Sequence, residues 1–334
     1  MKPSELTSFL TTAFSNRRQV LIKGSPGIGK SDVVDQAIAA CGAVGLIKHP
    51  AVEDPIDAKG LPGHDTIDGL KIARFFPFDD LYAMMTATKL TVVHLEDFGQ
   101  ASPATQASYM QLLLRREING KKLSPDVVFV ATTNDTKDCA GVGGLLEPVK
   151  SRFHTIIELE VSLDDWVNWA ITNNLPPALV AYIRSCPDAL NEFKPTKQLT
   201  NSPCPRTWAS VGKWESQGVT SQEVWAGSVG KGRAAEYLAF REEALSLPDP
   251  DACLLAPDTA PIPDKPSMRY AMSVAIAYRV SPSNFEQAIR YTSRIGKAFE
   301  TLTVTDSLRR NEKLAKTTAF ARWASDPVNR DVSL

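Results

Sequence analysis

A glycine-rich segment near the N-terminus carries the clearest chemical signal in the sequence. Residues 24–31 match the phosphate-binding pattern G-x-x-x-x-G-K-[ST] and lie between a strand pattern at 19–23 and a helical pattern at 32–41. In such a loop the backbone N–H groups surround phosphate oxygens, and the start of the helix adds its positive dipole end. The predicted nucleotide-binding residues are Gly24, Ser25, Pro26, Gly27, Ile28, Gly29, Lys30 and Ser31. We expect Lys30 to neutralise the β- and γ-phosphates and Ser31 to ligate Mg²⁺.

Two adjacent acids form the second chemical signal. Residues 91–95 have an apolar strand pattern, and Glu96 and Asp97 follow directly. A P-loop hydrolase needs carboxylates beside the γ-phosphate, one to hold Mg²⁺ through water and one to orient the attacking water. Two solvated acids at a strand end are the alternative, and the phosphate-loop pattern upstream favours the catalytic interpretation.

These two segments need a scaffold, which the apolar pattern predicts. Short strand patterns alternate with helical patterns over the first 160 residues, as is typical of a parallel α/β sheet. The predicted strands are 19–23, 45–48, 91–95, 127–132 and 155–159, and the predicted helices are 3–15, 32–41, 77–88 and 103–116. A turn at Asn119-Gly120, flanked by basic pairs, indicates a small hairpin, and we interpret its basic side chains as solvated.

The strand signal ends near residue 161, and helical patterns fill the rest of the chain. We therefore predict an α/β nucleotide-binding domain at 1–160 and a helical domain at 161–247. Six prolines between residues 248 and 266 interrupt helix, so this stretch is expected to be a linker. A helical C-terminal region is predicted at 267–334, with breaks near 281–282 and 301–306.

Composition excludes several classes of protein. The 334 residues carry 37 basic and 38 acidic side chains, and this balance argues against a dedicated duplex-DNA binder. No apolar run approaches the ~20 residues of a membrane helix, and no signal-peptide pattern opens the chain. The five cysteines and four histidines are scattered without zinc-ligand spacing, which indicates neither a disulfide framework nor a metal cluster. These features favour a cytoplasmic protein without a membrane segment.

The motifs occur in an order that resembles the MoxR-like AAA+ ATPases. Residues 95–106 resemble the Walker B stretch of that family, and residues 130–134 resemble its sensor 1 strand, which implies that Asn134 orients the lytic water. Residues 146–153 resemble the arginine-finger segment, so Arg152 is implied to reach a neighbouring subunit's nucleotide. Residues 202–208 resemble the start of the sensor 2 helix, and Arg206 is implied to face the phosphates of its own subunit. Two connecting stretches are also similar, 54–62 and 163–166.

One departure from the family concerns the two acids. The family's Asp-Glu order is inverted here, so position implies that Glu96 has the Mg²⁺ role and Asp97 the catalytic role. Asp97 is one methylene shorter than the usual glutamate, and misplacing the attacking water can cost up to about a hundredfold in rate. Slow hydrolysis, or a nucleotide-gated switch with little turnover, is a consequence that the sequence allows.

The resemblance implies a Mg²⁺-ATP-dependent AAA+ ATPase with an α/β P-loop domain, an all-helical lid and a helical C-terminal region. It also implies a ring of identical subunits, a hexamer in the family, and chaperone-like remodelling of a protein partner that carries a von Willebrand factor A domain. Two alternatives stay open. One is a nucleic-acid motor or clamp-loader-like ATPase, against which the near-neutral charge counts. The other is a nucleotide-binding assembly module that does not hydrolyse, which the inverted acids keep open.

Overall fold

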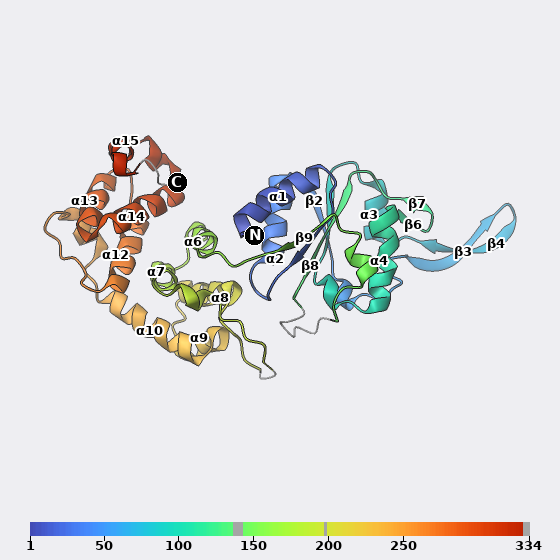
Figure 1. Ribbon diagram of the computed structural model, residues 1–334, viewed down its shortest axis with the longest axis horizontal. Helices are drawn as coiled ribbons and strands as arrows, with labels where there is room; N and C mark the ends of the chain where they lie inside the picture. Colours follow the sequence, from blue (N-terminus) through green and yellow to red (C-terminus); the bar gives the residue numbers. More distant parts are fainter. Residues whose placement is uncertain (136–142, 197–198, 330–334) are drawn as a thin grey trace. The chain divides into compact units, whose positions relative to one another are not determined.

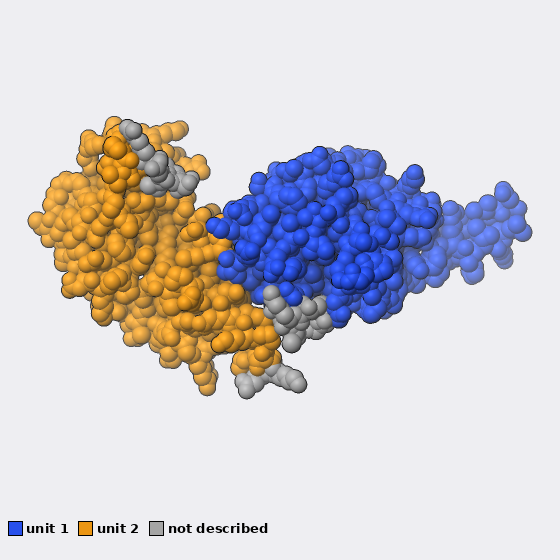
Figure 2. Space-filling model, viewed as in Figure 1, with its two compact units in different colours: residues 1–161 blue, residues 162–334 orange. Residues whose placement is uncertain are grey.

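The computed structural model describes residues 1–135, 143–196 and 199–329. The chain divides into two compact units, residues 1–161 and 162–334 (Figure 2). Within the described ranges, no helix is both long enough and apolar enough to cross a membrane.

The first unit is built on one parallel sheet with the strand order β2-β5-β8-β1-β9. Its strands are β1 (Val20–Lys23), β2 (Val44–Lys48), β5 (Thr91–Leu95), β8 (Val127–Thr133) and β9 (Thr155–Glu158). All five strands lie where the sequence pattern predicts them. Because the strands are parallel, their carboxyl ends meet at one edge of the sheet, and the segments that follow β1, β5 and β8 are neighbours there.

Helices cover both faces of this sheet (Figure 1). The helices of the first unit are α1 (Pro3–Ser15), α2 (Lys30–Ala40), α3 (Asp79–Thr86), α4 (Pro103–Arg115) and α5 (Glu147–Lys150), with short 3-10 turns η1 (Pro50–Val52) and η2 (Phe98–Gln100). Successive strand residues point to opposite faces, so Val128 packs with α1 and α2 whereas Phe129 packs with α3 and α4. The central strands β1, β5 and β8 are buried on both faces, which explains why they are continuous hydrophobic runs in the sequence.

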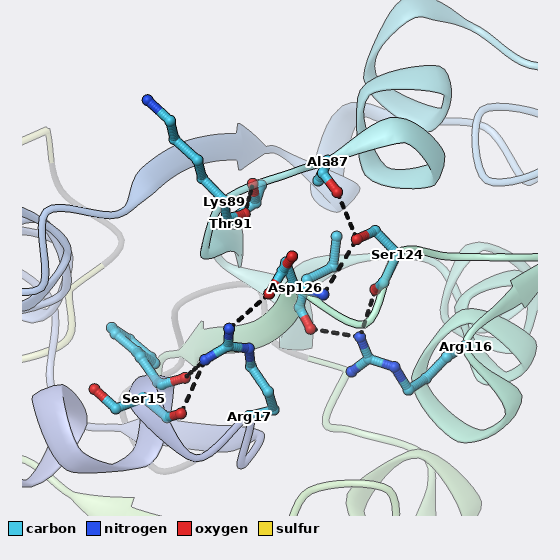
Figure 3. Close-up of polar contacts among 10 residues, drawn as sticks. Ser15, Arg17, Ala87, Lys89, Thr91, Arg116, Ser124 and Asp126 are labelled. Carbon is cyan, nitrogen blue, oxygen red and sulfur yellow. Dashed lines mark hydrogen bonds and ion pairs between the residues drawn. The ribbon is translucent and has the colours of Figure 1, made fainter.

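A polar network fixes the other edge of the sheet, where β5 and β8 begin (Figure 3). Arg17, just after α1, donates to the Asp126 carboxylate at 2.7 Å and to the Ser15 carbonyl at 2.8 Å. Arg116, just after α4, donates to the Ser124 carbonyl at 3.0 Å. Burial, together with the nearby Arg17 charge, lowers the pKa of Arg116. The network therefore holds the ends of two helices against the start of β8.

Two hairpins extend the first unit. The predicted small hairpin is confirmed, because β6 (Glu117–Ile118) pairs with β7 (Lys121–Lys122). A longer hairpin, β3 (Leu61–Ile67) with β4 (Leu70–Phe76), projects from the unit as a two-stranded ribbon (Figure 1). The sequence patterns did not predict it. Its turn is Asp68-Gly69, and both residues have positive φ, +52° and +79°, as a type I′ hairpin turn requires.

In the second unit all described secondary structure is helical, which confirms the predicted helical half. Its longer helices are α6 (Leu163–Thr172), α7 (Pro177–Ser185), α8 (Pro205–Ser216), α9 (Gln222–Val229), α10 (Lys231–Leu245), α11 (Pro250–Leu255), α12 (Pro266–Arg279), α13 (Phe285–Ile295), α14 (Lys297–Arg310) and α15 (Thr318–Ser325). Short 3-10 turns η4 (Pro187–Leu190), η5 (Glu312–Lys316) and η6 (Pro327–Asn329) complete it.

Two expectations about this half are corrected by the structure. The stretch 248–266 contains α11, and its Cys253 and Leu254 are buried beside Tyr291, so it is packed structure as well as connection. The expected break at 301–306 is absent, because α14 runs through it. Arg184 of α7 pairs with the fully buried Asp306 of α14, and tertiary contacts of this kind outweigh weak helix propensity.

Candidate active site

The glycine loop lies between β1 and α2, at the edge where the parallel strands end. Gly27 and Gly29 have φ of +76° and +97°, a region that residues with a side chain rarely adopt. A Cβ on Gly24 would lie 3.1 Å from the Leu159 carbonyl oxygen, so this position is also closely packed. Ile28 is buried in the core and anchors the loop. The loop is thus a fixed strand–loop–helix connection, and its backbone conformation and close packing require glycine at these positions.

Lys30 begins α2 and its ammonium turns back into the loop. The ammonium donates to the carbonyl oxygens of Gly24 and Ser25 at 2.8 and 2.9 Å. It also donates to Asn134 Oδ1 at 2.7 Å, across from the end of β8. Both Lys30 and Asn134 are buried at 8% exposure. The structure therefore brings the predicted phosphate-binding lysine and the predicted sensor residue into direct contact.

Ser31 and Glu96 meet beside this lysine. The Ser31 hydroxyl donates to Glu96 Oε1, although the two residues are 65 positions apart. The opposite carboxylate oxygen, Glu96 Oε2, lies 3.2 Å from Nδ1 of His49, which follows β2. Asp35 lies on α2, the helix that also carries Ser31. Burial first, and then the charges of Asp32 and Glu96, raise the pKa of Asp35.

This donor set fits Mg²⁺. A hydroxyl and a carboxylate oxygen are hard oxygen ligands, and Mg²⁺ in nucleotide sites uses one or two protein ligands together with water and phosphate oxygens. Within the described residues, no group of three or more His, Cys, Asp or Glu side chains could hold a metal ion. Ser31 and Glu96 would hold the ion, and Lys30 with the loop N–H groups would hold the phosphates.

Asp97 occupies a turn immediately after Glu96. Its backbone is left-handed, with φ +51° and ψ 36°, a conformation that aspartate tolerates better than most residues. Its N–H donates to Thr132 Oγ1 at 3.4 Å. In the described part of the chain, its partly exposed carboxylate makes no hydrogen bond or ion pair. Asp97 therefore follows Glu96 directly, and its carboxylate has no partner among the residues that the structure describes.

Arg152 is placed elsewhere. It follows α5 and precedes β9, and β9 pairs with β1 in parallel register from Val20↔Thr155 to Lys23↔Glu158. Arg152 therefore lies at the edge where these strands begin, whereas the glycine loop lies where they end. Four strand residues span about 13 Å. The arginine is consequently not part of the cluster around its own loop.

Arg206 belongs to the second unit, as the second residue of α8, and its side chain is exposed. The helix start is well ordered by local bonds, since Cys204 N donates to Thr207 Oγ1 at 2.9 Å. The sensor 2 role of Arg206 stays a prediction.

Three residues near the site were not singled out by sequence reasoning: His49, His94 and Thr132. His94, on β5, is 1% exposed, and its Nε2 lies 3.1 Å from Thr132 Oγ1. Burial lowers the pKa of His94 to about 4, with a smaller opposing effect of Glu96, so its ring is neutral at neutral pH. Strand order could have placed His49, because residues that follow adjacent parallel strands lie side by side.

Among known proteins, solved structures resemble this chain only distantly. No family model matches the chain, and no curated protein does. Among solved structures, the Thermotoga maritima RuvB Holliday junction branch migration motor aligns over 90% of this chain and 86% of its own, at 15% identity and a TM-score of 0.40. A point mutant of that RuvB aligns over 88% and 82%, at 15% identity and a TM-score of 0.41.

NtrX from Brucella abortus, solved in complex with ADP, aligns over 96% of this chain and 66% of its own, at 11% identity and a TM-score of 0.40. Similarities of this size do not carry over substrates or partners, so the assignment rests on the geometry of this chain. That geometry comprises the strand order β2-β5-β8-β1-β9, a glycine loop that follows β1, and an all-helical second unit. The chain therefore has a P-loop-type α/β fold: a parallel sheet with the glycine loop after β1, followed by an all-helical second unit.

Proposed function

We propose that this chain binds ATP together with Mg²⁺ and hydrolyses it. One observation carries the proposal: the ends of three neighbouring strands bring Lys30, Glu96 and Asn134 together at the glycine loop. Lys30 contacts Asn134, 104 positions away, and Glu96 contacts Ser31, 65 positions away. A solvated surface lysine and a solvated surface acid would not make such long-range contacts. The arrangement supplies a cation for phosphates, ligands for a metal and polar groups for a water molecule.

Each residue has a distinct task in the proposed reaction. Lys30 would place positive charge beside the β- and γ-phosphates, and Ser31 and Glu96 would hold the Mg²⁺ ion that neutralises them. Asp97 orients the attacking water and accepts its proton, and Asn134 holds the same water. The bound Mg²⁺-nucleotide supplies the transferable phosphoryl group and part of the charge neutralisation. We propose that turnover is slow, because Asp97 is shorter than the glutamate that the family resemblance implies.

We further propose that the chain works as a MoxR-like ring, a hexamer by that resemblance, with Arg152 acting on the neighbouring subunit's nucleotide and Arg206 on its own. The position of Arg152 supports action in trans, since it lies at the opposite edge of the sheet from its own loop. Its neighbour Phe153 packs edge-on against Phe98, with ring centroids 6.5 Å apart. This contact links the arginine segment to the turn that carries the catalytic acids.

The proposed partner is a protein, which the ribbon β3–β4 favours over a nucleic acid. One face of the ribbon exposes Leu61, Ile67, Leu70, Ile72 and Phe76. A two-stranded ribbon is marginally stable alone, and exposed apolar patches commonly mark protein-binding surfaces. On that face Arg74 is paired with Asp65 and offers little charge to phosphates. The resemblance names a von Willebrand factor A domain as the partner's module.

The nucleotide part is tested with Lys30→Ala and with Lys89→Ala, an exposed lysine that serves as the matched control. Titration with a fluorescent ATP analogue should show little or no binding for Lys30→Ala and unchanged binding for the control. Equal affinity in both folded variants would falsify the loop assignment. ATP binding by the wild type without turnover would favour the non-hydrolysing module instead.

The partner part is tested with the hydrolysis-blocked Asp97→Asn variant bound to ATP. A protein captured by this variant should be lost when Leu70→Lys is added, because a charge then interrupts the apolar face. Thr66→Lys, on the opposite face of the ribbon, should leave capture unchanged. ATP turnover that is stimulated by DNA, with no such ribbon-dependent capture, would favour the nucleic-acid motor.

A further inference from the structure

A buried histidine lies behind the catalytic turn. His94 sits on β5, opposite Val130 of β8, and its Nε2 is 3.1 Å from Thr132 Oγ1. The same Thr132 oxygen accepts the backbone N–H of Asp97 at 3.4 Å. A chain of two hydrogen bonds therefore runs from the His94 ring through one hydroxyl to the backbone of the proposed catalytic acid.

The direction of these bonds follows from the available donors. The Thr132 oxygen already accepts from Asp97 N–H, and a hydroxyl also has one proton to donate. If it donates to Nε2, the His94 proton sits on Nδ1, which is buried without a partner among the described residues. The other tautomer would leave both the Thr132 proton and the Nδ1 lone pair unpartnered. The first arrangement leaves fewer unmet groups, so His94 accepts and Thr132 donates.

This arrangement orients the weak hydrogen bond between the Asp97 N–H and Thr132 Oγ1. A threonine hydroxyl rotates freely until something accepts its proton. Once the His94 ring accepts it, a lone pair of the Thr132 oxygen is held toward the Asp97 N–H. Asp97 needs such support because its φ of +51° is an uncommon conformation for a residue with a side chain.

A histidine at position 94 costs folding free energy unless its ring has a specific role, because the position is buried. Its strand neighbours Val92, Val93 and Leu95 are fully buried apolar residues, and an apolar side chain there would avoid burying a ring nitrogen that has no partner among the described residues. Nδ1 of His94 is such an atom. A buried, partly unsatisfied imidazole beside a catalytic turn is therefore better explained by its contact with Thr132 than by packing.

We propose that His94 is a positioning residue of the active site: through the Thr132 hydroxyl, it holds the Asp97 backbone so that the carboxylate faces the attacking water. The proposal rests on the proposed ATP hydrolysis for its kinetic consequence. Its structural half, the hold on the Asp97 amide, concerns the protein without nucleotide.

The test uses His94→Leu and Thr132→Val, each of which removes one side chain from the hydrogen-bonded series His94–Thr132–Asp97. Both should lower kcat about tenfold or more while KM and ATP affinity change little, because displacement of a reacting group by about an ångström costs up to about a hundredfold. Thr132→Ser, which keeps the hydroxyl, should recover most of kcat. The double variant His94→Leu with Thr132→Val should be no slower than the worse single variant.

A matched control separates positioning from stability. Val128→Ala makes a cavity in β8 without touching the chain of hydrogen bonds. If its kcat falls as much as that of His94→Leu at equal loss of stability, the role of His94 is merely structural and the proposal is wrong. An unchanged kcat in His94→Leu would overturn it equally.

A second measurement keeps the structural half decidable if the wild type proves not to hydrolyse ATP. Amide hydrogen exchange of Asp97, measured on the full-length protein without nucleotide, should be faster in His94→Leu and Thr132→Val than in the wild type and Thr132→Ser. Unchanged exchange refutes the hold on Asp97. Absence of turnover in the wild type with the expected exchange would count against the proposed hydrolysis alone.

Discussion

Acidification should destabilise the first unit through His94. Burial, with a small contribution from His49, lowers the pKa of the folded His94 side chain from 6.5 to about 4, and Glu96 opposes this shift. In the unfolded chain the ring has its ordinary pKa. Between these two values the unfolded state binds a proton that the folded state does not bind.

The sign and size of the change in the free energy of unfolding with pH follow from this difference in pKa. The contribution of His94 to stability is fully present above pH 6.5 and is lost progressively as the pH falls toward about 4. Each unit of pKa difference corresponds to about 1.4 kcal/mol, so the loss over this window is about 3 kcal/mol. A domain is typically stable by only about 5–15 kcal/mol, so this loss is measurable and large.

The assay compares the free energy of unfolding between pH 7.5 and 4 for the wild type and His94→Leu, without nucleotide and with a chelator. All six tryptophans lie beyond residue 161, so their fluorescence reports on the second unit. Hydrogen exchange of peptides that cover β5 therefore reports on the first. His64→Leu, which removes an exposed histidine on the ribbon, should keep the pH dependence of the wild type. If His94→Leu also keeps it, the buried neutral imidazole is not the cause.

Three further predictions concern the proposed catalytic groups and the second unit. Arg152→Ala should bind ATP almost normally but hydrolyse it about 10³–10⁵-fold more slowly if the finger acts as in well-studied P-loop enzymes, and mixing it with Lys30→Ala should restore some activity; full specific activity in a demonstrably monomeric preparation would contradict this. Exchanging the acids, Glu96→Asp with Asp97→Glu, should retain or raise the turnover number, whereas loss of activity in the exchange together with an active Asp97→Asn would reverse the two roles. Arg184→Ala leaves a fully buried carboxylate with a weaker ion pair and should destabilise the second unit by about 3–5 kcal/mol, measured by tryptophan fluorescence during urea unfolding.

The centre of the parallel sheet could be predicted from sequence because β1, β5 and β8 are buried on both faces. Runs such as residues 127–132 are apolar without alternation, and each is bounded by polar turn residues. The glycine loop has a fixed spacing, so its residues could be named as well. Both signals are local, and the sequence contains them in full.

The ribbon β3–β4 was missed for a different reason. It is exposed on both faces, so it lacks the buried apolar run on which the other strands were predicted. Its one local signal is Asp68-Gly69, a dipeptide that favours a two-residue hairpin turn. The continuous α14 was missed because Asp306, a poor helix residue by propensity, is stabilised by Arg184 from 122 positions away. Long-range partners of this kind are not visible in a local pattern.

The structure also suggests why the acid pair can be inverted. Glu96 spans two partners, with Oε1 at the Ser31 hydroxyl and Oε2 at His49 Nδ1, and the longer side chain suits a position that must reach both. The shorter Asp97 has a left-handed backbone and an amide held by Thr132, so its carboxylate is aimed by the main chain more than by side-chain length. On the proposed mechanism, the inversion leaves Ser31 and Glu96 able to hold Mg²⁺. Slow turnover would then come from a longer distance between the Asp97 carboxylate and the attacking water.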